Sequence, residues 1–202
     1  MQNLPGPFDV AKDFIRKFLF ILTSFSFAWC VASDIPAPLH EQKIKAGLVY
    51  NLIKYTAWPK ASLIPQNHLK NNYNSPTLTI CLFGGDPFDG YLSPLQGRTA
   101  QQTVISIIDV NTIAEAGQCN VIIIHHSQLV QLKALLEFLH GKSILTISDM
   151  ENFAELGGMI ELARQEEKIE LTINKNSLDN SKLIIDSKML KLAKIVTTGG
   201  AP

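Results

Sequence analysis

The clearest alternation of apolar and polar residues lies in Ile169-Glu170-Leu171-Thr172-Ile173. An apolar run at 159–163 precedes it, and the polar residues 165–168 separate the two. Period-two alternation is typical of a strand with one buried and one solvated face. The pattern therefore predicts an antiparallel hairpin with its loop at 165–168. Gly157 and Gly158 let the chain enter this hairpin at backbone angles that other residues avoid.

A nearly continuous apolar run at 78–83 predicts a strand that is buried on both faces, as in a parallel sheet. Further strands are predicted at 103–110, at 120–126, which is again almost wholly apolar, and at 144–147. Leucines at helical spacing predict a helix between the third and fourth runs, capped by Ser127. A short helix is also expected at 88–95, and a closing helix at 188–196 with Ser187 as its cap.

The first helix is predicted over residues 40–58, because Pro59 ends the helical pattern. Its apolar stripe consists of Ile44, Leu48, Leu52 and Tyr55, widened by Val49 and Ile53. Three lysines, Lys43, Lys45 and Lys54, lie off the stripe. Such spacing predicts an amphipathic helix that buries the stripe.

Strands that alternate with helices predict a mostly parallel sheet with helices on its faces. The expected fold class is α/β, a single three-layer domain whose mostly parallel sheet is flanked by helices, with a C-terminal antiparallel hairpin at one side. In a doubly wound sheet of order 2-1-3, the first and third strands are neighbours. Cys81 lies within the first strand and Cys119 just before the third, so this order allows a disulfide between them.

The first 32 residues have the anatomy of a secretory signal peptide. Basic residues at 12, 16 and 17 precede an apolar run at 18–31, which is shorter than the roughly 20 residues of a membrane span. Cleavage is expected after Ala32, and an uncleaved membrane anchor is the alternative. Residues 33–42 are then expected to form a flexible mature N-terminus, residues 43–196 the domain, and residues 197–202 a disordered tail.

Charge and cysteine content narrow the class of protein. The 202 residues carry 18 basic and 18 acidic side chains, which give a formal net charge of zero. This balance argues against a nucleic-acid binder, which holds phosphates with excess positive charge. Signal cleavage would remove Cys30, and export to an oxidising compartment favours a disulfide between the two remaining cysteines.

A glycine-rich turn, Gly84-Gly85-Asp86, follows the first buried strand. It lacks the spacing of dinucleotide and triphosphate loops, so a plain strand-to-helix turn is favoured over a phosphate site. His125 and His126 end the third strand, and adjacent strand residues point to opposite faces, which argues against a shared metal. Ligands bind such sheets at the carboxyl ends of the strands. These five residues are therefore the candidate ligand crevice.

Catalysis is not expected from this sequence. Ser127, His126 and Asp149 are the only nucleophile, base and orienting group that we could assemble. Nothing in their spacing supports such a triad, and Ser127 serves better as a helix cap. We expect a protein that is not an enzyme and holds no metal or cofactor.

Large aromatic side chains at the end of the first helix form the candidate interaction surface. These are Tyr50, Tyr55 and Trp58. Aromatic residues often anchor protein interfaces. Core packing is the alternative, and it is favoured for Tyr55, which lies in the apolar stripe.

Several blocks of the sequence resemble the YfiR/HmsC family of periplasmic proteins. They are KAGLVYNLIKYTAWP at 45–59, LTICLFGGDPF at 78–88, and the region 148–196 that contains the hairpin. The most specific parts are Tyr-x-x-Trp-Pro at the end of the first helix and Phe-Ala-x-x-Gly-Gly-Met-Ile before the Lys-Ile-x-Leu-x-Ile-Asn strand. The blocks also occur in the same order, from about residue 43 to residue 196.

The resemblance implies regulation rather than catalysis. YfiR-like proteins repress a membrane-bound diguanylate cyclase by binding its periplasmic sensor domain, which restrains cyclic-di-GMP synthesis and biofilm formation. The resemblance also implies a periplasmic location, an outer-membrane OmpA-like lipoprotein as a further partner, a homodimer, and a structural disulfide consistent with Cys81 and Cys119. A second cysteine pair of some members is absent here. The alternative function is a small-ligand binding module that feeds another membrane sensor, such as a histidine kinase.

Overall fold

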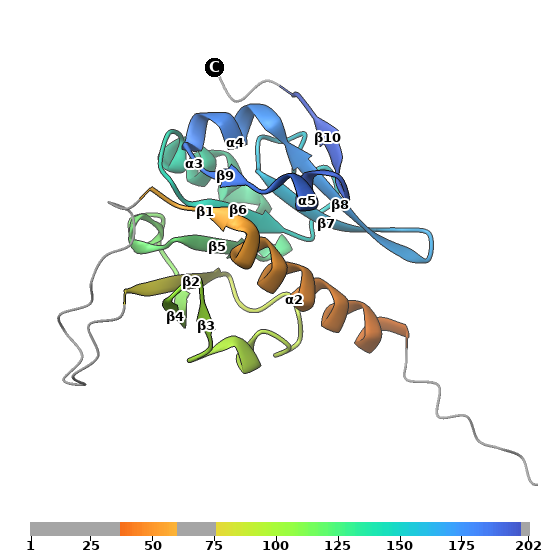
Figure 1. Ribbon diagram of the computed structural model, residues 1–202. Coiled ribbons are helices and arrows are strands. Elements are labelled where there is room, and N and C mark those ends of the chain that lie inside the picture. Colours follow the sequence, from red (N-terminus) through yellow and green to blue (C-terminus); the bar gives the residue numbers. More distant parts are fainter. Residues whose placement is uncertain (1–36, 60–75, 199–202) are drawn as a thin grey trace, which may run out of the picture. The chain divides into compact units, whose positions relative to one another are not determined.

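An eight-stranded sheet forms the centre of the fold in the computed structural model, which describes residues 37–59 and 76–198 (Figure 1). Its strands are β2 (Thr77–Phe83), β3 (Thr99–Ala100), β4 (Thr103–Val110), β5 (Val121–Ile124), β6 (Leu145–Ser148), β7 (Ile160–Gln165), β8 (Lys168–Asn174) and β10 (Lys194–Val196). They lie in the order β10-β8-β7-β6-β5-β2-β4-β3. All neighbours are parallel except β7–β8 and β3–β4, so the predicted mostly parallel α/β sheet is confirmed.

The strand order at the centre of the sheet agrees with the order predicted from the sequence. Strand β2 lies between β4 and β5, with Ile80 opposite Ile107 on one side and opposite Val121 on the other. The first and third buried strands are thus neighbours, as a doubly wound sheet requires. Strand β5 is shorter than the predicted 120–126, because the chain leaves the sheet at His125 and enters the 3-10 helix η4 (His126–Gln128).

The β7–β8 hairpin is antiparallel as predicted, but its loop and its place in the sheet differ from the prediction. Gln165 pairs with Lys168, so the turn consists of Glu166 and Glu167 alone, and Glu166 has a φ of 55°. On its outer side, β8 pairs in parallel with β10. The hairpin therefore lies inside the sheet and not at its edge.

The half of this hairpin away from its turn is covered on both faces, although its alternation predicted one solvated face, whereas residues 164–168 are exposed. Glu161 and Thr172 pair across β7 and β8 and are only 8% and 5% exposed. The Glu161 carboxylate accepts hydrogen bonds from the backbone N–H groups of Asn152 and Ala154, at 3.3 and 3.0 Å. The turn at 151–157 thus covers the polar face and supplies the donors that a buried carboxylate requires.

Alternate residues of the central strands enter two separate cores. On one face, Ile80 and Leu82 pack with Val49, Leu52 and Ile53 of helix α2 (Ala37–Tyr55). On the other face, Cys81 and Phe83 pack with Leu132, Leu135 and Leu139 of helix α3 (Leu129–Leu139). The continuous apolar runs of the strands arise because each strand must bury side chains on both faces.

Helix α2 begins and ends earlier than the sequence pattern predicts. It begins at Ala37, inside the segment that was expected to be flexible, and it ends at Tyr55. The next residues form strand β1 (Thr56–Ala57), which pairs with β9 (Ile184–Ile185). The buried face of α2 is also rotated relative to the predicted stripe, since Lys45 is 4% exposed and Ile44 is 41% exposed.

The side-chain amide of Gln101 holds the C-terminal end of α2. Its Nε2 atom lies 3.0, 2.7 and 2.8 Å from the carbonyl oxygens of Ile53, Lys54 and Thr56. Carbonyls in the last turn of a helix lack partners within the helix. Gln101 reaches them from the turn between β3 and β4, and it stops the helix four residues before Pro59.

The C-terminal region differs most from the prediction. Residues 188–196 do not form one helix: helix α5 (Ser187–Leu190) is followed by strand β10. Asp186, not Ser187, caps α5 and accepts a hydrogen bond from Lys188 N at 2.8 Å. Helix α4 (Lys175–Ser181), capped by Asn174, occupies a stretch without an apolar helical pattern. The short helix expected at 88–95 is a series of turns that ends in the 3-10 helix η2 (Ser93–Leu95).

Several predictions fall outside the described residues. These are the signal peptide at 1–32 with its membrane-anchor alternative, Cys30, residues 33–36 of the mature N-terminus, and residues 199–202 of the tail. Within 37–59 and 76–198, no helix is both long enough and apolar enough to cross a membrane.

Candidate interaction surface and ligand crevice

The two segments of the candidate crevice meet at one edge of the sheet. Strands β2 and β5 are parallel neighbours, and His125 N donates a hydrogen bond to Phe83 O at 3.0 Å. The turn at 84–86 and the histidines at 125–126 therefore lie side by side at the carboxyl ends of these strands. This is the juxtaposition that the sequence predicts for a doubly wound sheet.

Gly84 and Asp86, which were expected to face a ligand, are instead in contact with neighbouring residues of the protein. A Cβ atom at Gly84, whose φ is 86°, would lie 2.5 Å from Cγ of Gln128, so the side chain of Gln128 fills this space. The Asp86 carboxylate accepts hydrogen bonds from the N–H groups of Phe88 at 2.8 Å and Gly90 at 3.0 Å. Gly84 and Asp86 thus serve the strand-to-turn connection, as the simpler interpretation of the sequence holds.

His125 and His126 do not point to opposite faces, which corrects the prediction. Strand β5 ends at Ile124, and the two ring centroids are 4.0 Å apart with their planes tilted by 38°. The alternation of side chains holds only within a strand, and both residues follow its end. Across residues 37–59 and 76–198, no three His, Cys, Asp or Glu side chains come together to hold a metal ion.

Ser127 forms a hydrogen bond with His125 rather than with His126. Its Oγ atom lies 2.9 Å from His125 Nδ1, which also accepts from Ser127 N at 3.1 Å. A side-chain atom that accepts a backbone N–H at this position caps the helical turn that follows. Asp149, the third residue of the triad considered above, binds the ammonium group of Lys45 at 3.1 Å. His125, not Ser127, therefore caps this turn, and helix α3 begins after Gln128 without a side-chain cap, which corrects the predicted capping by Ser127.

A small pocket lies away from this crevice, between α3, β6 and α4. Its volume is about 40 Å³, and its lining includes Leu136, Leu139, Met159, His140 and Asn180. On its polar side, Asn180 Nδ2 lies 3.5 Å from His140 Nε2. A volume of this size holds a few water molecules or a small aliphatic group rather than a whole metabolite.

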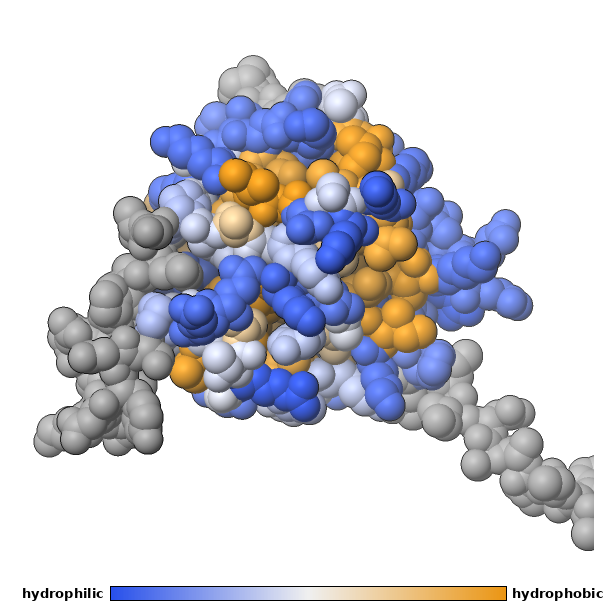
Figure 2. Space-filling view, in the orientation of Figure 1, coloured by the Kyte–Doolittle hydropathy of each residue, from blue (hydrophilic) through white to orange (hydrophobic). Residues whose placement is uncertain are grey.

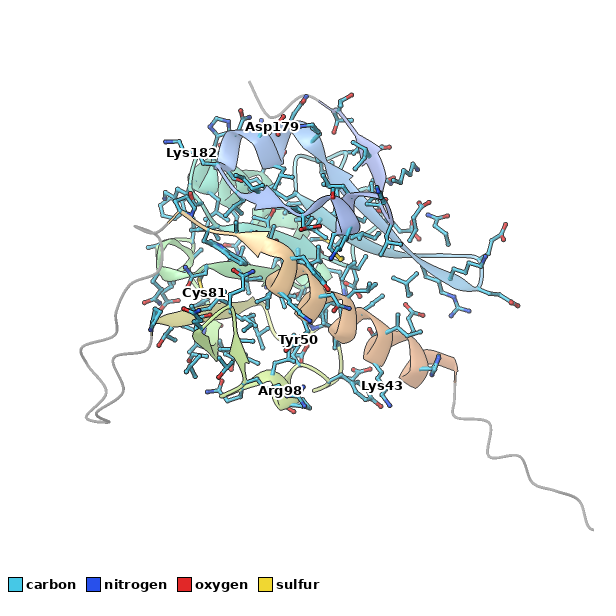
Figure 3. The ribbon with its side chains drawn as sticks, in the orientation of Figure 1. Lys43, Tyr50, Cys81, Arg98, Asp179 and Lys182 are labelled. Atoms are coloured by element: carbon cyan, nitrogen blue, oxygen red, sulfur yellow. A yellow bond between two sulfur atoms is a disulfide. The ribbon has the colours of Figure 1, made fainter. Side chains whose placement is uncertain are left out.

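The aromatic residues of the candidate interaction surface do not form one surface. Trp58 is 9% exposed, and its Nε1 atom donates a hydrogen bond to the carbonyl of Asn120 at 3.3 Å, so it belongs to the core. Tyr50 and Tyr55 are both half-buried, and a separation of five residues places them about 140° apart around α2. Figure 3 shows Tyr50 with Lys43 on the side of α2 that faces away from α5.

Tyr55 is the aromatic residue that two lysines approach. Lys54 Nζ lies 5.5 Å and Lys188 Nζ lies 6.0 Å from the centre of its ring. The main chains are held together as well, because Asp186 N donates to Tyr55 O at 2.8 Å. Lys188 could not be assigned to this site from the sequence, since it arrives through the pairing of β1 with β9.

An ion-pair network at the start of α2 was also absent from the prediction. Lys45 Nζ lies 2.7 Å from Glu41 Oε1 and 3.1 Å from Asp149 Oδ2, and Arg164 Nη1 lies 3.3 Å from Glu41 Oε2. The network ties α2 to the end of β6 and to the hairpin. The i, i+4 spacing of Glu41 and Lys45 is its only signal in the sequence.

Cys81 and Cys119 form the predicted disulfide, with Cα atoms 5.9 Å apart. Both residues are buried, with 0% and 4% exposure, in the core beneath α3. A reducing agent therefore reaches this bond only when the surrounding core opens. The disulfide fastens β2 to the segment that leads into β5.

Comparison with known sequences identifies a protein family that matches most of the described residues. A sequence model of the YfiR/HmsC-like family matches residues 42–194, which is well over half of the chain. No curated protein sequence matches the chain. The matched range contains most of α2, the disulfide and the sheet as far as the first residue of β10.

Proposed function

The chain belongs to the YfiR/HmsC-like family, and we propose that it is a periplasmic regulator of cyclic-di-GMP synthesis. It binds the periplasmic sensor domain of an inner-membrane diguanylate cyclase and so restrains synthesis and biofilm formation. The family match over residues 42–194 is the observation that carries this proposal. The role is one of binding, without catalysis and without a metal or cofactor.

The buried disulfide supports export to the periplasm. Disulfides form and persist in oxidising compartments and are rare in the cytosol. Cys81 and Cys119 are bonded to each other in the core. Export by an N-terminal signal peptide at 1–32 is part of the same proposal.

The mechanism we propose is a shift between two conformations of the sensor domain. A protein that binds the inactive conformation more tightly raises its population, and only the difference between the two affinities has this effect. A hundredfold preference corresponds to about 2.7 kcal/mol. An OmpA-like lipoprotein of the outer membrane would relieve repression by competing for the regulator, which acts as a monomer or as a homodimer.

Deletion of the gene tests the proposal directly. The deletion should raise cellular cyclic-di-GMP, and the wild-type gene should restore the original level. The matched control is a gene that lacks codons 2–32, whose product stays in the cytoplasm and should not restore it. Affinity purification of the exported protein after in-cell cross-linking should recover a diguanylate cyclase. An unchanged nucleotide level together with no cyclase in the cross-linked material would refute the proposal.

A second candidate function is a small-ligand module that feeds another membrane sensor, such as a histidine kinase. The pocket between α3, β6 and α4 is the observation that favours it, and its volume of about 40 Å³ restricts the bound group to a small aliphatic one. A thermal-shift screen with small aliphatic compounds tests this function, and Leu139→Trp, which fills the pocket from α3, is the comparison variant. A ligand that raises the melting temperature of both proteins equally does not bind in this pocket.

A further inference from the structure

One flank of α2 is left uncovered beside α5. Ile44, Leu48 and Tyr55 lie along this flank because they are four and seven residues apart. Ile44 is 41% exposed, whereas Leu48 and Tyr55 are half-buried against the core. Helix α5 contacts α2, and the residues after it continue the apolar surface, with Leu192 72% and Ile195 43% exposed.

We call this surface the α2–α5 face and define it by Ile44, Lys54, Tyr55, Lys188, Lys191, Leu192 and Ile195. Figure 2 shows hydrophobic residues gathered on the side of the molecule where α2, α5 and β10 lie, with hydrophilic residues between them. Apolar surface that is interleaved with charged groups in this way is typical of protein interaction sites.

The charge of the α2–α5 face is positive, although the whole protein has a formal net charge of zero. Lys54, Lys188 and Lys191 are exposed, and none of them forms an ion pair with a carboxylate within the described residues. The nearest acidic residue along the chain, Asp186, already accepts the backbone N–H of Lys188 as the cap of α5. The lysines thus remain available to a partner.

We propose that the α2–α5 face docks an acidic segment of a partner protein. A partner carboxylate binds beside Tyr55, where it is attracted by the ammonium groups of Lys54 and Lys188, which lie 5.5 and 6.0 Å from the centre of the ring. Aliphatic side chains beside that carboxylate cover Leu192 and Ile195. The identity of the partner, the sensor domain of the cyclase, rests on the proposed function.

The convergence of two lysines on one ring favours an acidic protein over the other possible occupants. In a symmetric dimer the same patch occurs on both subunits, so two copies would place these lysines against one another, and like charges at an interface are unfavourable. An anionic lipid surface attracts lysines wherever they are spread, and it does not require two of them to share one aromatic side chain. A carboxylate that binds beside Tyr55 is attracted by both ammonium groups.

Charge reversal with a matched control separates docking from folding. The test variant is Lys54→Glu/Lys188→Glu, and the control is Lys133→Glu/Lys168→Glu, whose exposed lysines lie on α3 and on the hairpin. A second pair compares Leu192→Ser with Val130→Ser, since Val130 is 96% exposed on α3. Equal melting temperatures and periplasmic levels within each pair show that the fold is retained.

The readouts are cyclic-di-GMP in the deletion strain and the affinity for the purified sensor domain. Lys54→Glu/Lys188→Glu should fail to restore repression and bind at least about tenfold more weakly, and Leu192→Ser should weaken binding too. Both control variants should behave like the wild type. If Lys54→Glu/Lys188→Glu represses and binds like the wild type, this face is not the docking surface, while the proposed function stands.

Photo-cross-linking from position 192 tests the face even if the proposed function fails. A deletion that leaves cyclic-di-GMP unchanged removes the cyclase as the partner. A benzoylphenylalanine at position 192, but not one at position 130, should then still cross-link to an acidic segment of another exported protein. Cross-links only to a second copy of this chain, or none at all, would overturn the inference.

Binding to lipid vesicles tests the remaining occupant. The wild type and Lys54→Glu should bind equally to vesicles of phosphatidylethanolamine and phosphatidylglycerol. Weaker binding by Lys54→Glu alone would assign the face to lipid and overturn the inference.

Discussion

The ammonium group of Lys45 lies 3.1 Å from the carboxylate of Asp149, although 104 residues separate them and Lys45 is only 4% exposed. Glu41 completes the pair from the preceding turn of α2, at 2.7 Å. A buried cation is tolerated only when charges or hydrogen bonds compensate it. This contact therefore fixes the start of α2 against the end of β6, and it sets which face of the helix is buried.

Replacing Lys45 should weaken the fold strongly. Lys45→Met removes the cation and leaves the carboxylates of Glu41 and Asp149 facing each other, so the free energy of unfolding should fall by about 3 kcal/mol. Urea denaturation at neutral pH measures this change. The control is Lys43→Met on the exposed side of α2, which should change the free energy by no more than about 0.5 kcal/mol. Equal stability of the two variants would show that the pair contributes nothing beyond packing.

Alanine substitutions at Gly158 and Gly47 should change the free energy of unfolding in opposite directions. A Cβ atom at Gly158 would clash with the ring of Phe153, which is fully buried. Gly158→Ala should therefore lower the free energy of unfolding by about 2 kcal/mol through overpacking. At Gly47, in the exposed part of α2, a Cβ atom meets nothing within 4 Å, and Gly47→Ala should stabilise the protein by about 1 kcal/mol.

A double variant separates the contact at Gly158 from a backbone effect. Phe153→Leu shortens the side chain that a new Cβ would meet, so the destabilisation by Gly158→Ala should be smaller in the Phe153→Leu background. Gly157 is different, because its φ of 102° strains any other residue whatever the space around it. Additive effects of Phe153→Leu and Gly158→Ala in chemical denaturation would speak against the close approach.

The central sheet was predictable because its signals are local. The runs that became β2 and β5 are mostly apolar, and strands of a parallel sheet that are buried on both faces require this. Because β2 and β5 are neighbours in a sheet of this order, Cys81 and Cys119 lie close together. By contrast, residues 188–196 carry apolar side chains at helical spacing, and it is the pairing of β10 with the distant β8 that makes the last three of them a strand.

The candidate surfaces were less predictable because they depend on contacts between distant residues. Trp58 follows the first helix in sequence, but the turn of the chain into β1 directs it to the carbonyl of Asn120 and into the core. Lys188 reaches Tyr55 only because β1 pairs with β9. For Lys45, the spacing along α2 placed the side chain off the apolar stripe, and its burial becomes favourable through Glu41 together with the distant Asp149, which directly follows β6.

Acid should selectively remove the contribution of Glu115, at the start of the 3-10 helix η3 (Glu115–Gln118). Hydrogen bonds from the N–H groups of Asn111 and then Thr112, at 2.9 and 3.0 Å, lower the pKa of this carboxyl below its usual 4.5. Because the pKa is lower in the folded state, the ionised carboxylate stabilises the fold above about pH 4.5, and this contribution is lost as the pH falls through the folded-state pKa.

Glu115→Gln tests this pH dependence. The variant should be less stable than the wild type at neutral pH, and the difference should shrink as the pH falls below about 4.5. Urea denaturation across this range measures it, and Glu155→Gln, on an exposed turn, is the control. A difference between Glu115→Gln and the wild type that stays constant with pH would mean that the carboxylate charge is not involved.

Removing the disulfide should lower the free energy of unfolding by more than the packing of either cysteine side chain contributes. Cys81 and Cys119 are 38 residues apart, and a cross-link over such a loop stabilises a protein by about 4 kcal/mol in the loop-entropy account. Cys81→Ala/Cys119→Ala should lose about this much in urea denaturation. A reductant should lower the midpoint of the wild type most of the way to that of the variant, because both then lack the cross-link, and the remaining difference measures the packing of the two buried sulfur atoms. If the oxidised wild type unfolds at the same urea concentration as the variant, the covalent bond adds nothing to the packing around it.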